Sequence, residues 1–210
     1  MGAAAFLSFE RRQRNAPSDR QHVAQIEPVE PAGPESDLHL TLAVALLKGE
    51  KFDLVVQKAT ELGASRIVPV VSARADVRIG DPDDSRRRVK RWQRIALEAA
   101  KQSGRARLME VGEPVAFDSL IKSPAHDDEL RLMFAERAGT SFDELLTNLH
   151  SRSVKLTVLV GSEGGWTDQE IADALVAGWK IVTLGGRVLR AETAAIVVAA
   201  LLQHRFGDLV

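Results

Sequence analysis

The chain has no cysteine among its 210 residues, which excludes disulfide bridges, thiolate metal sites and cysteine nucleophiles. Long apolar runs are missing too. The longest, Ala194–Leu202, has nine residues, about half of what a bilayer-spanning helix needs. We therefore expect this run to be a buried helix, and we expect a cytoplasmic protein with no membrane partner.

Two common ligand-binding patterns are also absent. The five histidines are scattered without the spacing of metal ligands, so we predict no metal site. No glycine-bearing segment ends in Gly-Lys-Ser or Gly-Lys-Thr, which argues against a nucleoside-triphosphate enzyme of the P-loop type.

The N-terminal segment differs in composition from the rest of the chain. Residues 1–37 are polar and interrupted by proline and glycine, with short strands expected at Phe6–Arg11 and His22–Ile26. A hairpin followed by a linker fits this pattern. The segment is shorter than the roughly 40 residues that normally fold without disulfides or metals, so we expect it to depend on contacts with another part of the protein.

From Leu38 onward, strand-like and helix-like runs alternate, which predicts an α/β domain with a largely parallel sheet. The expected strands are Leu38–Leu46, Arg66–Val71, Ala106–Val111, Leu130–Ala135, Leu156–Val160 and Ile181–Leu184. The expected helices are Phe52–Leu62, Ser85–Gln102, Ser141–Leu149, Thr167–Ala177 and Glu192–His204. Ligands of such sheets bind outside the carboxyl ends of the strands.

Two glycine-bearing loops lie at such ends. Residues 161–165, Gly-Ser-Glu-Gly-Gly, separate an apolar strand-like run from the capping box that begins at Thr167. Residues 184–193, Leu-Gly-Gly-Arg-Val-Leu-Arg-Ala-Glu-Thr, separate the last expected strand from the last helix. Glycines let backbone groups approach a ligand closely, so the pair of loops suits a nucleotide-like ligand. The first loop taken alone is more typical of an ordinary strand-to-helix turn.

Charge is distributed unevenly, although the formal net charge of the chain is only −1. Residues 86–107 contain nine basic residues and one acid, for a net +8, and the remainder carries −9. Val89, Trp92, Ala96 and Ala99 recur at helical spacing, so one face of this helix can pack while the arginines point outward. A phosphate backbone is the obvious acidic partner. A solvated helix face that only aids solubility remains an alternative.

Six motifs in order along the chain resemble the RsmE-type methyltransferases of the SPOUT superfamily. They are Lys48–Lys51, Gln57–Gly63, Glu98–Arg105, Gly161–Gly165, Leu184–Ala194 and Arg205–Leu209. The resemblance covers about Leu38 to Val210. It implies an S-adenosylmethionine-dependent enzyme that methylates N3 of a uridine in small-subunit (16S) ribosomal RNA, free or in the 30S particle.

The resemblance also implies an architecture. Residues 38–210 would form a SPOUT methyltransferase domain, with a parallel sheet and a C-terminal trefoil knot, a rare exception to unknotted chains. Residues 1–37 would be a partial β segment of a PUA-like barrel, with its linker. A homodimer is implied, with the active site completed across the interface. The residues expected to bind the cofactor are Val160, Gly161, Glu163, Gly164, Leu184, Gly185, Leu189, Arg190, Glu192, Thr193 and Ala194.

The remaining expectations concern the residues that would assist methyl transfer to N3 of uracil. The N3 proton must leave, and cationic donors near the two carbonyl oxygens would stabilise the resulting negative charge. Arg105 and Arg190 are the candidate donors, and Glu136 is a candidate base. Each has a structural alternative, because Arg190 and Glu192 could brace the loop, Arg105 could hold phosphate and Glu136 could pair near Arg137. The expected RNA contacts are Arg74, Arg87, Arg88, Arg91, Arg94 and Arg105.

Two hypotheses of different class stay open. One is an active RNA methyltransferase. The other is a non-catalytic RNA-binding or cofactor-binding relic that keeps the fold, because relatives carry a full PUA-like barrel and this chain has residues for only part of one.

Overall fold

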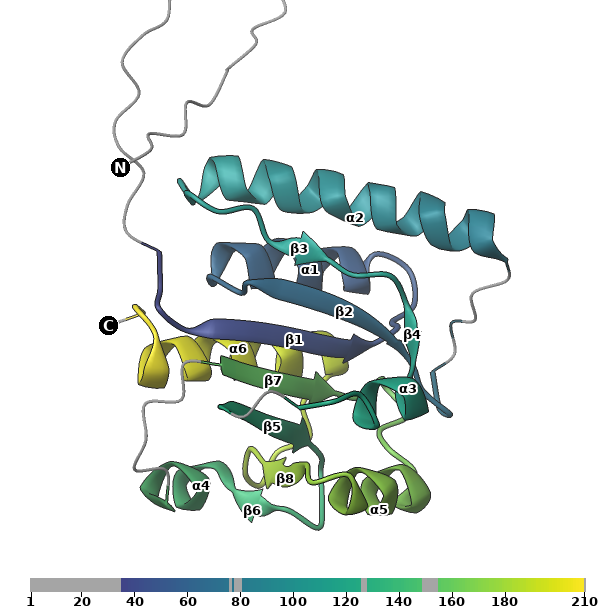
Figure 1. Cartoon of the computed structure of the whole chain (residues 1–210), viewed down its shortest axis with the longest axis vertical. Coiled ribbons are helices and arrows are strands. Elements are labelled where there is room, and N and C mark those ends of the chain that lie inside the picture. Colours follow the sequence, from purple (N-terminus) through teal and green to yellow (C-terminus); the bar gives the residue numbers. More distant parts are fainter. Residues whose placement is uncertain (1–34, 76, 78–80, 126–127, 149–154, 210) are drawn as a thin grey trace, which may run out of the picture.

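The computed structural model describes residues 35–75, 77, 81–125, 128–148 and 155–209. Within these ranges an eight-stranded parallel sheet has the order β3-β2-β1-β7-β5-β8-β6, and β4 also pairs with β2 (Figure 1). The strands are β1 His39–Ala45, β2 Arg66–Val71, β3 Glu110–Val111, β4 Val115–Ala116, β5 Glu129–Phe134, β6 Thr140–Ser141, β7 Lys155–Val160 and β8 Lys180–Thr183. The helices are α1 Lys51–Glu61, α2 Pro82–Gln102, α3 Phe117–Ile121, α4 Phe142–Asn148, α5 Asp168–Val176 and α6 Ala191–Phe206.

The α/β class and the parallel sheet expected from the sequence are confirmed. Each strand and helix expected from Leu38 onward has a counterpart, although the strand expected at Ala106–Val111 is confined to β3. The sequence patterns missed β4, β6 and α3, which have two, two and five residues. Elements this short contain little more than one repeat of a hydrophobic pattern, which is too little to identify them in the sequence, so tertiary contacts decide their conformation. The two strands expected before residue 35 lie outside the described residues.

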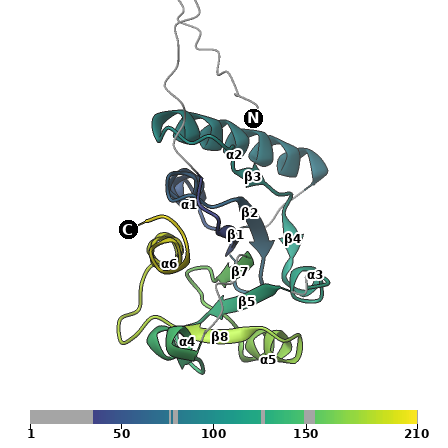
Figure 2. The same cartoon turned by 60° about the vertical axis from the view of Figure 1, so that its left-hand side comes forward.

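Helices cover both faces of the sheet, which explains why its longer strands are mostly apolar (Figure 2). On one face Leu42, Val158 and Leu132 belong to a core shared with α1, α2, α4 and α6. On the other face Leu159 and Met133 belong to a second core shared with α3 and α5. Successive side chains of each strand thus alternate between two cores, as the pleat requires.

Strand order brings three distant segments together. Strand β7 lies between β1 and β5, and β8 follows on the far side of β5. Val160 is in register with both Val44 and Phe134, and Phe134 is in register with Val182. The carboxyl ends of β7, β5 and β8 therefore lie side by side, and so do the loops that leave them.

The basic segment forms the longest helix, α2. Asp81 caps its start by accepting a hydrogen bond from the backbone N–H of Asp84 at 2.7 Å, and Pro82 follows at the first helical position. The buried face, expected from the helical spacing, includes Trp92, whose ring centroid lies 4.5 Å from that of Phe52 on α1. Packing of this face against α1 leaves the opposite, cationic face toward solvent.

None of the described helices combines the length and the apolar character that crossing a bilayer would require. Among the same residues, no three His, Asp or Glu side chains come together in a way that could hold a metal ion.

Candidate functional site

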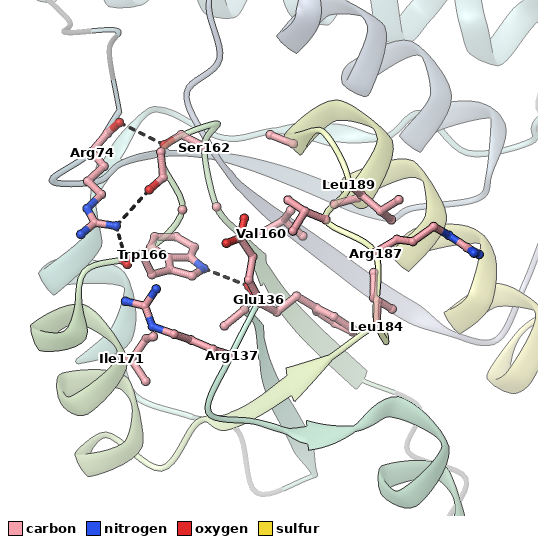
Figure 3. Close-up of a pocket in the computed structure, with 18 of the residues that line it drawn as sticks. Arg74, Glu136, Arg137, Val160, Ser162, Trp166, Ile171, Leu184, Arg187 and Leu189 are labelled. Atoms are coloured by element: carbon pink, nitrogen blue, oxygen red, sulfur yellow. Dashed lines mark hydrogen bonds between the residues drawn. The ribbon is translucent and has the colours of Figure 1, made fainter.

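A cavity of about 240 Å³ opens at the carboxyl edge of the sheet, where the loops after β5, β7 and β8 meet (Figure 3). The first glycine loop, residues 161–165, follows β7. The second, residues 184–193, follows β8 and runs into the first turn of α6. Arg74, in the segment after β2, closes one side. The side chains and backbone that line the cavity belong to Arg74, Phe134, Ala135, Glu136, Arg137, Val160, Gly161, Ser162, Gly164, Gly165, Trp166, Ile171, Leu184, Gly185, Gly186, Arg187, Val188, Leu189, Ala191 and Ala194.

Trp166 shapes the first glycine loop. Its indole Nε1 donates a hydrogen bond of 2.9 Å to the carbonyl oxygen of Phe134, which ties the loop to the end of β5. A Cβ on Gly161 would lie 3.2 Å from the indole ring, closer than most Cβ contacts in proteins. Gly165 has φ +63°, a conformation that favours glycine. The glycines therefore let the backbone turn tightly beside the ring.

Arg74 holds the other side of this loop. Its Nη1 donates hydrogen bonds of 3.1 Å to the carbonyl oxygens of Gly164 and Trp166, and its own carbonyl accepts one of 3.1 Å from Ser162 Oγ (Figure 3). The sequence assigned Arg74 to RNA contact. In the structure, the guanidinium fixes the shape of the cavity wall through Nη1, and the RNA contact stays a prediction.

The capping box expected at Thr167 is confirmed. Thr167 Oγ1 accepts from the N–H of Glu170, and Glu170 Oε2 accepts from the N–H of Thr167 at 2.8 Å. Glu170 Oε1 also accepts a hydrogen bond of 2.9 Å from the N–H of Ala73. One buried carboxylate thus connects the start of α5 to the segment that carries Arg74.

The structure separates the eleven residues expected to contact the cofactor into two groups. Seven line the cavity: Val160, Gly161, Gly164, Leu184, Gly185, Leu189 and Ala194. The other four, Glu163, Arg190, Glu192 and Thr193, are not among the lining residues. The geometry of the single chain therefore does not support direct contact between these four residues and a ligand in this cavity.

Glu163 has a different partner. Its Oε1 accepts a hydrogen bond of 2.7 Å from Lys51 Nζ, so the first glycine loop is pinned to the start of α1. This hydrogen bond raises the pKa of Lys51. Partial desolvation and the positive charge of Arg190 lower that pKa, the negative charges of Glu163 and Glu192 raise it, and the net shift is upward. A cluster of charges therefore lies beside the cavity, at the first turn of α6.

The three candidate catalytic residues are not brought together. Glu136 lines the cavity, and one of its carboxylate oxygens lies 4.0 Å from the position that a Cβ of Gly165 would take. Arg190 is exposed and precedes α6 as its N-cap residue. Arg105 is remote from the residues that form the cavity.

For Arg105 the structure corrects both expected roles. Its Nη1 donates to the carbonyl oxygens of Thr60 and Ala64 at 3.1 and 2.8 Å, and its Nη2 lies 2.8 Å from Glu35 Oε2. Only 8% of the side chain is exposed. A guanidinium whose donors are used in this way cannot also bind phosphate or a uracil carbonyl without breaking these hydrogen bonds, so its role is structural.

The arginines of α2 fall into two classes. Arg88 is paired with Asp84 at 3.0 Å, and Arg91 is paired with Asp53 of α1. Arg87 and Arg94 are exposed, and neither forms an ion pair with another residue that the structure describes. Because acids just before the basic run neutralise part of it, the cationic surface is smaller than the count of residues predicted.

Several cavity residues were not singled out from the sequence. Phe134, Ala135 and Arg137 surround the end of β5, and Trp166 and Ile171 follow the first glycine loop. The available signal was the expected strand Leu130–Ala135, because its carboxyl end had to fall at the same edge as the glycine loops. The position of β5 between β7 and β8 was not visible in the sequence.

Comparison with known proteins adds an independent finding. Residues 34–203 match the model of the RNA methyltransferase domain family. Ribosomal RNA small subunit methyltransferase E of Bacillus subtilis is 30% identical over 175 residues, which cover 81% of this chain and 68% of that protein. The chain belongs to the ribosomal RNA small subunit methyltransferase E family.

Two solved structures are similar to this fold. The crystal structure of the Neisseria gonorrhoeae enzyme, bound to S-adenosylmethionine, gives a TM-score of 0.75 at 33% identity and covers 84% of this chain and 70% of that one. A Legionella pneumophila methyltransferase in complex with S-adenosylmethionine gives a TM-score of 0.76 at 32% identity, covering 83% and 69%.

Some relatives are considerably longer. The family member of Synechocystis is 36% identical over 166 residues, yet this chain spans only 53% of its length. The match therefore concerns the methyltransferase domain, and the activity of the complete relatives is a separate question for this chain.

Proposed function

We propose that the chain is an S-adenosylmethionine-dependent methyltransferase that acts on N3 of a uridine in small-subunit ribosomal RNA. The observation that carries the proposal is that seven of the eleven expected cofactor-binding residues line one cavity at the carboxyl edge of the sheet. Two solved relatives are bound to S-adenosylmethionine. Membership of the same family supports the same ligand here.

The residues present fit this cofactor. Leu184, Val188 and Leu189 offer an apolar wall for the adenine ring, and Val188 is 75% exposed without a ligand. Gly185 and Gly186 have open space where a Cβ would be, so backbone groups can approach the ligand closely. When bound, the cofactor supplies an electrophilic methyl group on a cationic sulfur.

Charged residues at the cavity suit that cation and its substrate. The sequence assigned Glu136 to proton abstraction, but its place in the cavity wall suits the positive charge of the methyl donor better. Arg190, exposed at the end of the second glycine loop, remains the proposed donor to a uracil carbonyl oxygen. Glu163 and Thr193 are proposed to support the cofactor site from its rim.

A cationic face of α2 supports ribosomal RNA, free or in the 30S particle, as the partner. Arg87 and Arg94 are one helical heptad apart and both exposed, so they lie on the same side of the helix. Lys90 and Lys101 are also exposed on this helix. Contacts of this kind position a protein on a phosphate backbone without reading its sequence.

An apolar outer face of α6 supports a homodimer. Ile196, Val197, Ala200 and Leu201 are only half-buried, although α6 has no charged residue between Glu192 and His204. Figure 2 shows this helix at the outside of the layer that also contains α1. A helix that is apolar all round is normally buried, and a second copy of the chain would bury it.

The finer architecture is part of the same proposal. After β8 the chain passes β5 and β7 to reach α6, which packs against α1, and this path supports the trefoil knot of the SPOUT fold. Residues 1–37 would supply a partial PUA-like segment, which lies almost wholly outside the described residues. An enzyme of ribosomal RNA would work in the cytoplasm.

Calorimetric titration with S-adenosylmethionine is the first step in distinguishing an active methyltransferase from a non-catalytic relic. We expect saturable binding with one site per chain, and absence of binding would remove the enzyme. Transfer of a labelled methyl group to isolated 30S particles and to naked ribosomal RNA is the second step. Binding without transfer to either substrate would favour the non-catalytic relic.

A further inference from the structure

A second concave surface lies beside the cofactor cavity. It crosses the outer side of α1, between α2 and the first turn of α6, and we refer to it as the α1 groove. Its lining consists of Leu54 and Ile95, which are apolar, and five polar or charged residues, namely Glu50, Lys51, Asp53, Gln57 and Glu192. Leu54 is 40% exposed there. No role was assigned to this surface by the sequence patterns, although Glu192 was expected at the cofactor.

Glu192 is the unusual member of the groove. Only 9% of the residue is exposed, and its Oε2 is buried without a hydrogen-bond partner among the described residues. Buried carboxylate oxygens are almost always paired, because removing an unpaired charge from water is costly. Its place in the first turn of α6 offers helix-dipole compensation but no specific donor. A bound group with an N–H donor would complete this site.

The α1 groove and the cofactor cavity share the first turn of α6. Ala191 and Ala194 line the cavity, while Glu192, between them in sequence, lines the groove. Lys51 lies in the groove and is bonded to Glu163 of the first glycine loop. A ligand in the groove would therefore lie next to whatever occupies the cavity.

The chemistry of the groove fits the imide edge of uracil. Uracil presents an imide N–H flanked by two carbonyl oxygens, and the groove offers the carboxylate of Glu192 together with the ammonium group of Lys51 and the amide of Gln57. Leu54 and Ile95 provide an apolar surface for the ring. Cytosine has an acceptor at N3, which the carboxylate of Glu192 would repel.

We propose that the α1 groove receives the target uracil, with Glu192 accepting the N3–H and Lys51 donating to a neighbouring carbonyl oxygen. This inference rests on the proposed function. The N3–H bond breaks, its electron pair stays on the ring and spreads onto both carbonyl oxygens, and the proton passes to the Glu192 carboxylate. Lys51 stabilises the charge that develops. The methylated product no longer has the N3–H donor, so Glu192 no longer holds it.

The variant Glu192→Gln keeps the size of the side chain and removes its capacity to take a proton. We expect methyl transfer to 30S particles to fall at least about 100-fold, the usual contribution of a positioned base. Affinity for S-adenosylmethionine, measured by calorimetry, should change less than threefold. Glu144→Gln, the same change at an exposed position of α4, is the matched control. Full activity of Glu192→Gln, or a loss of its cofactor affinity, would each overturn the assignment.

Binding of a nucleoside in the α1 groove can also be measured directly, without an activity assay. With labelled methyl groups, uridine at millimolar concentration should shift the NMR resonances of Leu54 and Ile95, and 3-methyluridine and cytidine should not. Equal shifts from all three nucleosides, or none from uridine, would contradict the proposal. So would shifts that depend on protein concentration alone, because a second copy of the chain would then cover the groove.

These experiments distinguish failure of the proposed function from failure of the groove assignment. If the unchanged protein neither binds S-adenosylmethionine nor transfers a methyl group, the proposed function fails and this inference fails with it. If the unchanged protein is active and Glu192→Gln is equally active, only the assignment of the groove is wrong.

Discussion

Glu35 and Arg105 form an ion pair that is largely shielded from water. Arg105 Nη2 lies 2.8 Å from Glu35 Oε2, and the two side chains are 8% and 13% exposed for Arg105 and Glu35 respectively. Glu35 Oε1 also accepts a hydrogen bond of 2.8 Å from the N–H of Arg107. The pair joins the residues just before β1 to the segment after α2, and through Arg105 to the turn after α1.

Replacing Glu35 with Gln should therefore lower stability. Arg105 would remain buried with its charge uncompensated, and breaking a buried pair of this kind costs about 3 kcal/mol. Urea unfolding at neutral pH measures the change in free energy. Glu98→Gln, which alters an exposed pair with Lys101, is the control and should change the free energy by less than about 1 kcal/mol.

The same pair predicts a pH dependence. Burial raises the pKa of Glu35, but the Arg105 guanidinium and the Arg107 N–H outweigh it, so the net pKa is lowered. A carboxyl with a lowered pKa in the folded state stabilises the fold above its unfolded pKa, and this stability is lost as pH falls through the folded pKa. The gap in unfolding free energy between the unchanged protein and Glu35→Gln should thus narrow in acid. A gap that is constant from neutral to acid pH would contradict the prediction.

Gly164 should tolerate no side chain. A Cβ there would lie 3.0 Å from Arg74 Cβ and 3.1 Å from the Arg74 carbonyl oxygen, so the loop would have to move. We expect Gly164→Val to abolish measurable affinity for S-adenosylmethionine in calorimetry while the circular dichroism spectrum is retained. Gly186→Ala places a Cβ in open space of the same cavity and should cost less. Equal affinity for all three proteins would mean that the loop does not form the binding site.

Arg74 provides a test between two roles. If it holds the loop through the carbonyl oxygens of Gly164 and Trp166, Arg74→Lys should weaken cofactor affinity about tenfold, the cost of one or two hydrogen bonds. The salt dependence of RNA binding should not change. A smaller salt slope with unchanged cofactor affinity would restore the RNA-contact role expected from the sequence.

The two classes of arginine on α2 predict different effects on RNA binding. Replacing Arg87 and Arg94 with Ala should reduce the slope of log affinity against log salt by about 0.7 for each phosphate that the variant no longer binds. Replacing Arg88 and Arg91 with Ala should reduce it less, because Asp84 and Asp53 already neutralise these charges. Affinity measured between roughly 50 and 200 mM salt gives both slopes. Identical slopes for both double variants and the unchanged protein would identify this face as merely solvated.

The outer face of α6 predicts the oligomeric state. Val197→Glu would place a charge in the proposed interface and should convert a dimer into a monomer in size-exclusion chromatography with light scattering. Val176→Glu is the control, because Val176 is 90% exposed on α5. A dimer that survives Val197→Glu, or a monomer without any substitution, would contradict the proposed interface.

Local patterns determined much of the fold. The apolar strand runs and the 3.6-residue spacing of Val89, Trp92 and Ala96 are properties of short segments, and they predicted the α/β class, the parallel sheet and the packed face of α2. The glycine loops also followed from local chemistry, because a strand, glycines and a capping residue in succession define a strand-to-helix turn. The cofactor candidates came from the family resemblance, and seven of them line one cavity in the structure.

Only the tertiary structure decided which partner each charged side chain has. Arg74 and Arg105 are both arginines near basic or polar segments, yet one holds a loop and the other is buried against Glu35, 70 positions away in sequence. The place of β5 between β7 and β8, which brings Glu136 to the cavity, likewise depends on strand order. Hydrophobic periodicity is a property of residues that are close in sequence. Ion pairs and strand order depend on segments that are distant in sequence and that only folding brings together.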